Sequence, residues 1–499
     1  MKKIIINLLA IVLMSGLWGC TKLDENPVGL LDPDGFFKTK KDVQAAVYGI
    51  NGALAHESLF GRAYLTTLML RDDMSDIGNR STALDRINVN DFAVNSTNGL
   101  INQIWTQFYV VISCANNAEA GAKSLGLADS EINPLIAEAR FGRAFSYFHL
   151  VRVFGDLSYI DFAVADPESV KTISRTKEAD VYKSIIADLE FAKQWLPDKQ
   201  TSDSRTRPSK GTAASYLASV YLTLKDYPKA YTEAKYVIDN KALFGYELAP
   251  DYQNLYNAAT ANVLKETIYA IDFLGVQNQF SYNDDLMATM TAAQPWFNKS
   301  GFDVIVPSLK VYESFNTLDY RKKVSFDTVY AGVYYTNWVA FAKRPHIAKW
   351  SRFPGNNTNG RYTDHNYPDM RYAEVLLIAA EAIGENTGSN TEAEGYVNQV
   401  RARARNAAGV MGTYPADVPG GLDKTSFINL VLEERRIELA FEWKRWFDIK
   451  RRNLGDAVFK GANSLEPHAN FDASRDYLFP IPKTELDVNP NLGPQNTGY

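Results

Sequence analysis

Apolar residues recur at the spacing of amphipathic helices along most of this 499-residue chain. Between Glu131 and Phe154 they fall three and four positions apart, with charged residues between them. Similar segments lie at 41–56, 100–125, 180–195, 370–385, 392–407 and 425–450. Each such helix must bury its apolar stripe against a neighbour, so the pattern predicts a mainly α fold.

Two further helices, expected at 210–224 and 229–239, are joined by a short turn that ends at Pro228. Small residues lie on the surfaces through which these helices would meet, and an aromatic residue lies at the turn. The pair resembles a tetratricopeptide hairpin. We therefore expect tetratricopeptide-like helical hairpins that form a solenoid scaffold.

Two segments, 72–99 and 272–365, differ from the rest of the chain in composition and periodicity. They are rich in Asn, Asp, Ser, Thr, Gly and aromatic residues and lack a sustained helical period, which predicts long ordered loops with a few short strands. No Gly/Ser-rich or Pro-rich linker divides the chain. We expect one domain over 31–499, in which a loop-rich irregular half wraps the helical scaffold. The scaffold is expected mainly at 31–71, 100–270 and 366–452.

The first nineteen residues have the pattern of a secretory signal peptide: two lysines, a short apolar run and a small residue before Cys20. The run is too short to span a bilayer core of about 30 Å. Gly19 and Cys20 resemble the end of a bacterial lipoprotein signal, in which the cysteine is acylated and the chain is cut before it. The alternative is an ordinary secretory signal that ends in cysteine.

The polar tether at 20–30 resembles the surface-export signal of Bacteroidetes lipoproteins. Together with the lipoprotein signal, this resemblance implies an outer-membrane protein that is anchored by lipid on Cys20 and faces the cell exterior. The chain has only one other cysteine, Cys114, so acylation of Cys20 leaves no internal disulfide. We expect Cys114 to be a buried small hydrophobic residue, and stability to come from a large core.

Charge and motif content exclude several function classes. The formal charge is −5, from 53 basic and 58 acidic residues, which disfavours a nucleic-acid partner. The five histidines have no metal-ligand spacing, and no HExxH, CxxC, GxSxG or phosphate-binding Gly-rich motif is present, so we expect no metal site and no cofactor. Asp72, Asp73 and Asp76 favour a hydrogen-bonded loop over a calcium site.

Several stretches of the chain form recognisable motifs. They are Phe37–Thr39, Ile104–Trp105 with Tyr109 and Asn116, AEARFGRA at Ala137–Ala144 with Tyr147, YPDMRYAEVLLI at Tyr367–Ile378, ERRIELAFE at Glu434–Glu442 with Arg445–Asp448, and FPIP at Phe479–Pro482 with Asn489–Leu492. These motifs resemble those of the SusD/RagB family of nutrient-uptake lipoproteins from the outer membrane of Bacteroidetes. The resemblance covers nearly the whole chain. It implies a protein that captures a nutrient without breaking bonds and delivers it to a SusC-like TonB-dependent transporter, with a glycan or oligosaccharide as the expected cargo.

The charged motif residues also have a structural interpretation. Glu434, Glu438 and Glu442 are spaced four apart and would share one helix face, with arginines nearby as counterions. Such pairs typically fix helix packing. The alternative is a paired-carboxylate site for glycoside hydrolysis, which needs two carboxyl groups across a cleft, one of them with a raised pKa.

The aromatic content suits sugar binding, because a flat ring covers the apolar C–H face of a sugar while polar side chains bind the hydroxyl edge. The candidate ligand platforms lie in the second irregular segment: Trp296, Phe297, Tyr334, Tyr335 and Trp338. The candidate polar neighbours lie in the first: Asp73, Asn79 and Arg80. If both tyrosines lay on a strand, their rings would face opposite sides.

Four functions remain open from the sequence. A glycan-binding lipoprotein is preferred. A member of the same family that binds peptides or other nutrients is the next alternative. A lipoprotein glycoside hydrolase and a helical scaffold that binds only protein are further alternatives.

Overall fold

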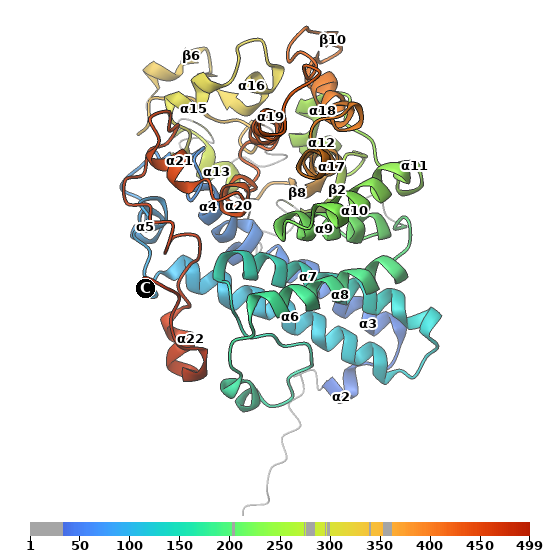
Figure 1. Ribbon diagram of the computed structural model, residues 1–499. Coiled ribbons are helices and arrows are strands. Elements are labelled where there is room, and N and C mark those ends of the chain that lie inside the picture. Colours follow the sequence, from blue (N-terminus) through green and yellow to red (C-terminus); the bar gives the residue numbers. More distant parts are fainter. Residues whose placement is uncertain are drawn as a thin grey trace, which may run out of the picture.

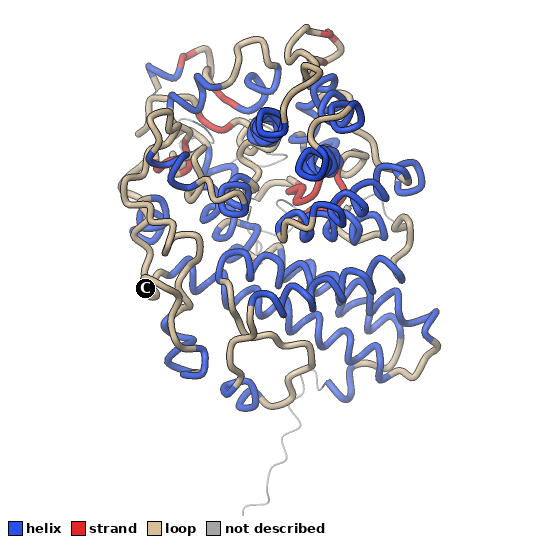
Figure 2. The backbone as a smooth tube through the Cα atoms, viewed as in Figure 1, coloured by secondary structure: helices blue, strands red, loops and turns tan. Residues whose placement is uncertain are grey.

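The computed structural model describes residues 33–201, 205–273, 275, 285–294, 296, 300–338, 341–352 and 362–499. The predicted signal peptide, the tether, Cys20 and Phe297 lie outside these residues. Helices dominate the described part, and the strands are short and paired two by two (Figures 1 and 2). No helix in the described part is long and apolar enough to cross a membrane.

The helical scaffold is a stack of hairpins, as the periodicity predicts. Its lower layer in Figure 1 contains α3 (Lys40–Leu54), α6 (Gly99–Ser124), α7 (Asp129–Phe154) and α8 (Glu178–Trp195). Above it lie α9 (Lys210–Thr223), α10 (Tyr227–Asp239), α17 (Tyr372–Thr387) and α18 (Thr391–Ala404). Each helix packs on its chain neighbour, and α10 also packs on α17, so the hairpins form a continuous superhelical core.

Local signals in the sequence set the helix ends. The side chain of Asn98 accepts hydrogen bonds from the backbone N–H groups of Leu100 and Ile101 and so caps α6. Ser209 and Thr212 form a reciprocal capping box at the start of α9. Asp226 caps α10, where Pro228 occupies the first turn. The two helices of the predicted hairpin are confirmed, although α9 ends one residue earlier and α10 begins two residues earlier than the sequence predicts.

The prediction of one continuous helix over 425–450 is wrong. The structure divides this segment into two helices, α19 (Lys424–Glu438) and α20 (Arg445–Arg451). Between them Phe441 and Trp443 adopt positive φ angles of 61° and 52°. The carbonyl oxygen of Phe441 accepts a hydrogen bond from the indole of Trp350, and the indole of Trp443 donates to Asp369. These long-range contacts hold a turn that local helix propensity would not form.

The irregular half contains short helices as well as the loops and strands that we expected. It includes α5 (Leu84–Asn90), α13 (Met287–Thr291), α15 (Leu309–Ser314) and α16 (Tyr320–Ser325). The strand pairs are β1 (Asp76–Ile77) with β3 (Ile305–Val306), β4 (Phe326–Asp327) with β7 (His346–Ile347), and β5 (Val329–Tyr330) with β6 (Val333–Tyr334). The pair of β2 (Thr267–Asp272) and β8 (Asn366–Arg371) joins this half to the scaffold.

Smaller elements complete the described part. They are α2 (Pro33–Phe36), η2 (Glu57–Gly61), α4 (Ala63–Met69), η3 (Pro167–Thr172), α11 (Lys241–Phe244), η4 (Tyr252–Tyr256), α12 (Ala258–Ala261), η6 (Tyr335–Asn337), β9 (Asn406–Ala407), β10 (Val410–Met411), α21 (Gly455–Lys460), α22 (Lys483–Val488) and η7 (Pro490–Leu492). Cys114 on α6 is half-buried against the core, and burial raises the pKa of its thiol.

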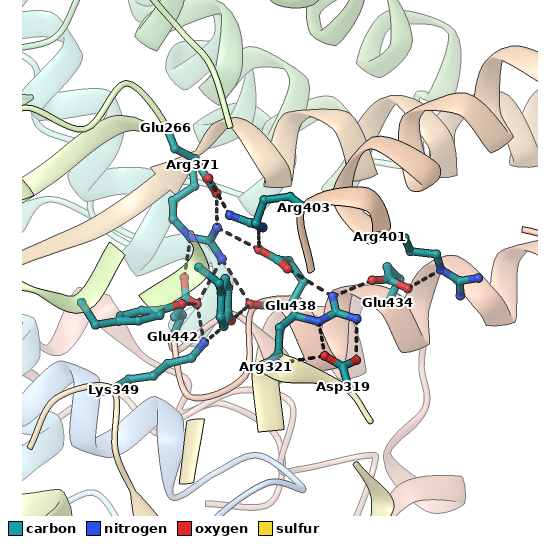
Figure 3. Close-up of polar contacts among 12 residues, drawn as sticks. Glu266, Asp319, Arg321, Lys349, Arg371, Arg401, Arg403, Glu434, Glu438 and Glu442 are labelled. Carbon is teal, nitrogen blue, oxygen red and sulfur yellow. Dashed lines mark hydrogen bonds and ion pairs between the residues drawn. The ribbon is translucent and has the colours of Figure 1, made fainter. Parts of the chain in front are cut away.

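A buried network of ion pairs joins the two halves (Figure 3). Arg371, at the end of β8, contacts the carboxylates of Glu266, Glu438 and Glu442. All four side chains are at most 1% exposed. Arg403 from α18 also pairs with Glu266 and Glu438. The strand pair, α18 and the α19–α20 turn therefore meet around one guanidinium.

The network continues into the irregular half. Arg321 on α16 binds Asp319, Glu434 and Glu438, and Lys349 binds Glu442 at 2.7 Å. Burial by itself would raise the pKa of Glu438 and Glu442, but the surrounding cations outweigh this effect and hold both pKa values below the ordinary range. Both glutamates are therefore ionised structural partners of the arginines.

Replacing Arg371 with methionine tests the network. We expect Arg371→Met to lower the free energy of unfolding by about 3–5 kcal/mol, because it leaves buried carboxylates without their shared cation. Lys183→Met is the matched control, since Lys183 is 77% exposed and pairs with Asp180 only at the surface; such pairs contribute about 0–1 kcal/mol. Denaturant unfolding measures both changes. Equal effects of the two substitutions would contradict a central role for Arg371.

Candidate functional site

A hollow of about 440 Å³ opens in the irregular half between α15, α16 and the β4–β5 segment. Its lining combines rings, cations and hydroxyl groups from segments far apart in the sequence. The described residues that line it are Trp296, Tyr312, Thr317, Lys322, Lys323, Phe326, Asp327, Thr328, Val329 and Arg352. This mixture of apolar surface with a few polar groups is typical of a small-ligand site.

The buried network positions one wall of the hollow. Asp319 caps α16 by accepting a hydrogen bond from the backbone N–H of Arg321, and its carboxylate also binds the Arg321 guanidinium. Arg321 is 1% exposed and reaches inward to α19 (Figure 3). The next two residues along α16, Lys322 and Lys323, line the hollow.

Arg352 fixes the β4 part of the lining and ties it to the end of α16. Its guanidinium donates to Asp327 at 2.8 and 3.0 Å and to the backbone carbonyls of Lys323 and Phe326 at 2.9 Å each. Burial raises the pKa of Asp327, although the charge of Arg352 opposes this rise. The pairing of β4 with β7 holds Phe326 opposite Ile347. Arg352 therefore joins α16 and β4 into one lining.

Trp296, which we predicted from the sequence as a ligand platform, contributes an aromatic side chain to the lining of the hollow. Its side chain is partly buried, and its ring centroid lies 4.4 Å from that of Tyr330. The indole N–H is buried and has no hydrogen-bond partner among the described residues. Across the lining, Tyr312 packs edge-on against Phe326, and the Lys322 ammonium lies 4.0 Å from the centre of the Tyr312 ring.

Tyr334 and Tyr335 do not follow the alternation expected of a strand. β6 ends at Tyr334, and Tyr335 begins the 3₁₀ turn η6. Their ring centroids consequently lie 4.4 Å apart, and Tyr334 is 45% exposed. The two rings form a small aromatic surface where β6 ends and η6 begins. Neither residue belongs to the lining of the hollow.

Two of the predicted ligand residues are buried. Trp338 is 2% exposed, and its indole donates to the carbonyl oxygen of Val333 at 2.8 Å, so its ring presents no free face to a ligand. Asp73 is also 2% exposed and accepts two hydrogen bonds from Arg445, at 2.7 and 2.8 Å. Both side chains hold segments of the fold together.

The remaining predicted polar residues lie in the loop before α5. The side chain of Asn79 accepts a hydrogen bond from the backbone of Ser81, and Arg80 pairs with Asp91 at 2.7 Å. Neither belongs to the lining of the hollow. The acidic cluster around Asp76 is a hydrogen-bonded loop, and no group of three or more potential metal ligands occurs among the residues that the structure describes.

Sequence reasoning missed most of the hollow. Tyr312, Lys322, Lys323, Asp327 and Arg352 carry no motif, and they come together only because α16 and β4 fold against the 346–352 segment. The one available signal was the adjacent lysine pair within an irregular segment that is otherwise rich in neutral polar residues.

A second hollow, of about 400 Å³, lies between α6, the 158–171 loop and the C-terminal α22 and η7. Its lining is largely aliphatic and includes Val110, Val164 and Val488. Trp105 is only 3% exposed there, and the hydroxyl of Tyr109 is bound to the carbonyl oxygen of Ser158. This hollow therefore offers less open ring surface and fewer charged partners than the first.

Comparisons with known proteins agree with the fold. The family model described as "SusD family" matches residues 330–499, and the one described as "Starch-binding associating with outer membrane" matches residues 38–222. A SusD homologue from Bacteroides thetaiotaomicron superimposes with a TM-score of 0.80 at 22% identity, covering 94% of this chain and 98% of that one.

Another solved structure is surface glycan-binding protein A from Bacteroides thetaiotaomicron in complex with laminarihexaose. It gives a TM-score of 0.76 at 20% identity, over 92% of this chain and all of the other. Among proteins compared by sequence, SusD-like protein P2 of Formosa agariphila is 48% identical over 98% of both chains. The chain therefore belongs to the SusD family.

Proposed function

We propose that this protein binds a glycan or oligosaccharide in the hollow beside Trp296 and α16. The observation that carries the proposal is the partly buried indole of Trp296, whose N–H has no partner among the described residues and adjoins a lining of rings and charged groups. A buried donor without a partner costs free energy, which a ligand hydroxyl would recover by accepting its hydrogen bond.

The lining matches the two kinds of surface on a sugar. Trp296 and Tyr312 supply apolar ring area for C–H groups, while Asp327, Thr328 and Arg352 supply polar atoms for the hydroxyl edge. Tyr334 and Tyr335 extend the aromatic surface beside it, which suits an extended chain of several sugar units. Two proteins of similar fold support this ligand class: one is described as a laminarin-binding SusD-like protein, and the other was solved in complex with laminarihexaose.

The cellular role in this proposal is capture at the outer membrane. An acyl chain on Cys20 anchors the protein, the polar tether places it on the exterior face, and a SusC-like TonB-dependent transporter receives the cargo. Family membership and the lipoprotein-like start of the sequence support these steps. A peptide cargo is the competing outcome, because the hollow also contains groups that bind peptide amides.

We infer binding without catalysis. Glycoside hydrolysis needs two carboxyl groups, one of them with a raised pKa. Among the described residues that line the hollow, Asp327 is the sole carboxylic acid, and it is held by Arg352. The paired glutamates of the sequence motif, Glu438 and Glu442, are buried in ion pairs and have lowered pKa values. These features favour a binding protein over a hydrolase.

Replacing Trp296 with alanine tests the site. We expect Trp296→Ala to weaken binding of the recognised oligosaccharide about tenfold, because it removes a ring face and a hydrogen-bond donor. Calorimetry against glycan and peptide panels measures the change, and Phe162→Ala, which removes a 47% exposed ring elsewhere on the surface, is the control. Equal affinity of Trp296→Ala and the parent protein would show that the hollow is not the binding site.

Incubation with the bound glycan tests the absence of turnover. We expect the chain length of the glycan to stay unchanged over a prolonged incubation, as measured by chromatography of the products. Products that form with the parent protein and disappear with Asp327→Asn would instead establish a hydrolase that uses the hollow.

A further inference from the structure

We propose that the saccharide held in this hollow is anionic, carrying carboxylate or sulfate groups that contact Lys322 and Lys323. The inference rests on the proposed function and adds the chemical class of the ligand. Its basis is the charge of the described residues that line the hollow: three cations, Lys322, Lys323 and Arg352, and one carboxylate, Asp327. The chain as a whole has the opposite sign, with a formal charge of −5.

Arg352 and Asp327 balance each other. The guanidinium donates two hydrogen bonds to one carboxylate oxygen, so this pair adds little net charge to the hollow. Within the described part of the lining, the two lysines of α16 therefore provide the net positive charge.

Lys322 is fixed by neutral groups. Its ammonium donates to the carbonyl oxygen of Phe315 at 2.8 Å and lies over the Tyr312 ring. Partial burial lowers the pKa of Lys322, while the nearby carboxylate of Glu313, which is outside the lining, raises it. No carboxylate in the described part lies within ion-pair distance of this ammonium. An ammonium held in this way beside a ring has donors left for an anion.

Lys323 is exposed, and within the described residues its ammonium makes no hydrogen bond or ion pair. Its backbone, in contrast, is held by Arg352, and the preceding Arg321 is locked into the buried network. The charge is thus exposed to solvent, while the backbone that carries it is held in place. Two lysines that are consecutive on α16 and both line an aromatic hollow match a sugar ring that stacks on Trp296 and carries an anionic substituent.

Neutral sugars would use the rings and the Asp327–Arg352 pair but would gain little from the lysines. An anionic sugar would form charge-assisted hydrogen bonds with them, and its affinity would fall as salt screens the attraction. An anionic ligand should therefore lose affinity when the lysine charges are removed or the salt concentration is raised, whereas a neutral ligand at the same site should not.

Affinity gel electrophoresis identifies the class. The full chain is run through gels that contain alginate or polygalacturonate as carboxylated polymers, carrageenan as a sulfated polymer, and starch, laminarin or xylan as neutral polymers. We expect retardation by at least one anionic polymer, and the comparison of the carboxylated with the sulfated gels distinguishes the two sources of charge. Calorimetry with oligosaccharides of the retained polymer then gives the affinity.

We expect Lys323→Gln to weaken that affinity about threefold and the Lys322→Gln/Lys323→Gln double variant at least tenfold, with a further loss between 50 and 500 mM NaCl. Lys183→Gln removes the same charge from an exposed position on α8 and is expected to have no effect. Lys323→Gln keeps the test decisive if the double variant does not fold, because Lys323 is exposed.

Retardation by neutral polymers alone, abolished by Trp296→Ala and insensitive to both lysine variants, would overturn the anionic ligand and leave the proposed glycan site intact. Anionic retardation that Lys183→Gln reduces as much as Lys323→Gln would reject specific lysine contacts. Absence of binding to every saccharide, with binding to peptides, would overturn the proposed function itself.

Discussion

The guanidinium of Arg371 is the interaction on which the arrangement of the two halves depends. It is contacted by three buried glutamates, which lie immediately before β2, at the end of α19 and in the α19–α20 turn. Ions in a protein interior lose their hydration, and only close geometry with further hydrogen bonds compensates for that loss. Here the carboxylates receive those bonds from Arg403, Lys349 and the hydroxyl of Tyr256, while the hydroxyl of Tyr252 accepts a hydrogen bond from the Lys349 ammonium. The network therefore specifies which segments meet, in addition to any stability it contributes.

The same network reaches the ligand hollow through α16. Arg321 binds Glu434 and Glu438 on α19, and the two residues that follow it line the hollow. A six-residue helix has little stability by itself, so its position depends on these tertiary contacts. In a protein without an internal disulfide among its described residues, such contacts keep an irregular segment rigid enough to present rings and cations in a fixed arrangement.

Much of the scaffold could be predicted from the sequence, because apolar spacing indicates α7 and the caps at Ser209 and Asp226 mark the starts of α9 and α10. The α19–α20 turn could not, since it is imposed by partners such as Arg371 and Trp350, which are distant in sequence. Trp296 was predicted as a ligand platform and does line the hollow. Trp338 has a similar sequence environment but is covered by the β5–β6 hairpin and His346, which no local pattern reveals.

Hydrogen exchange of the parent protein and of Arg321→Met measures most directly whether the buried ions hold the wall of the hollow. If they do, the amides of α16 and β4 exchange faster in the variant, whereas those of α7 keep their parent rates. Arg80→Met, which removes an exposed arginine from the loop before α5, should leave α16 unchanged. Parent-like protection of α16 in Arg321→Met would show that the network does not position the site.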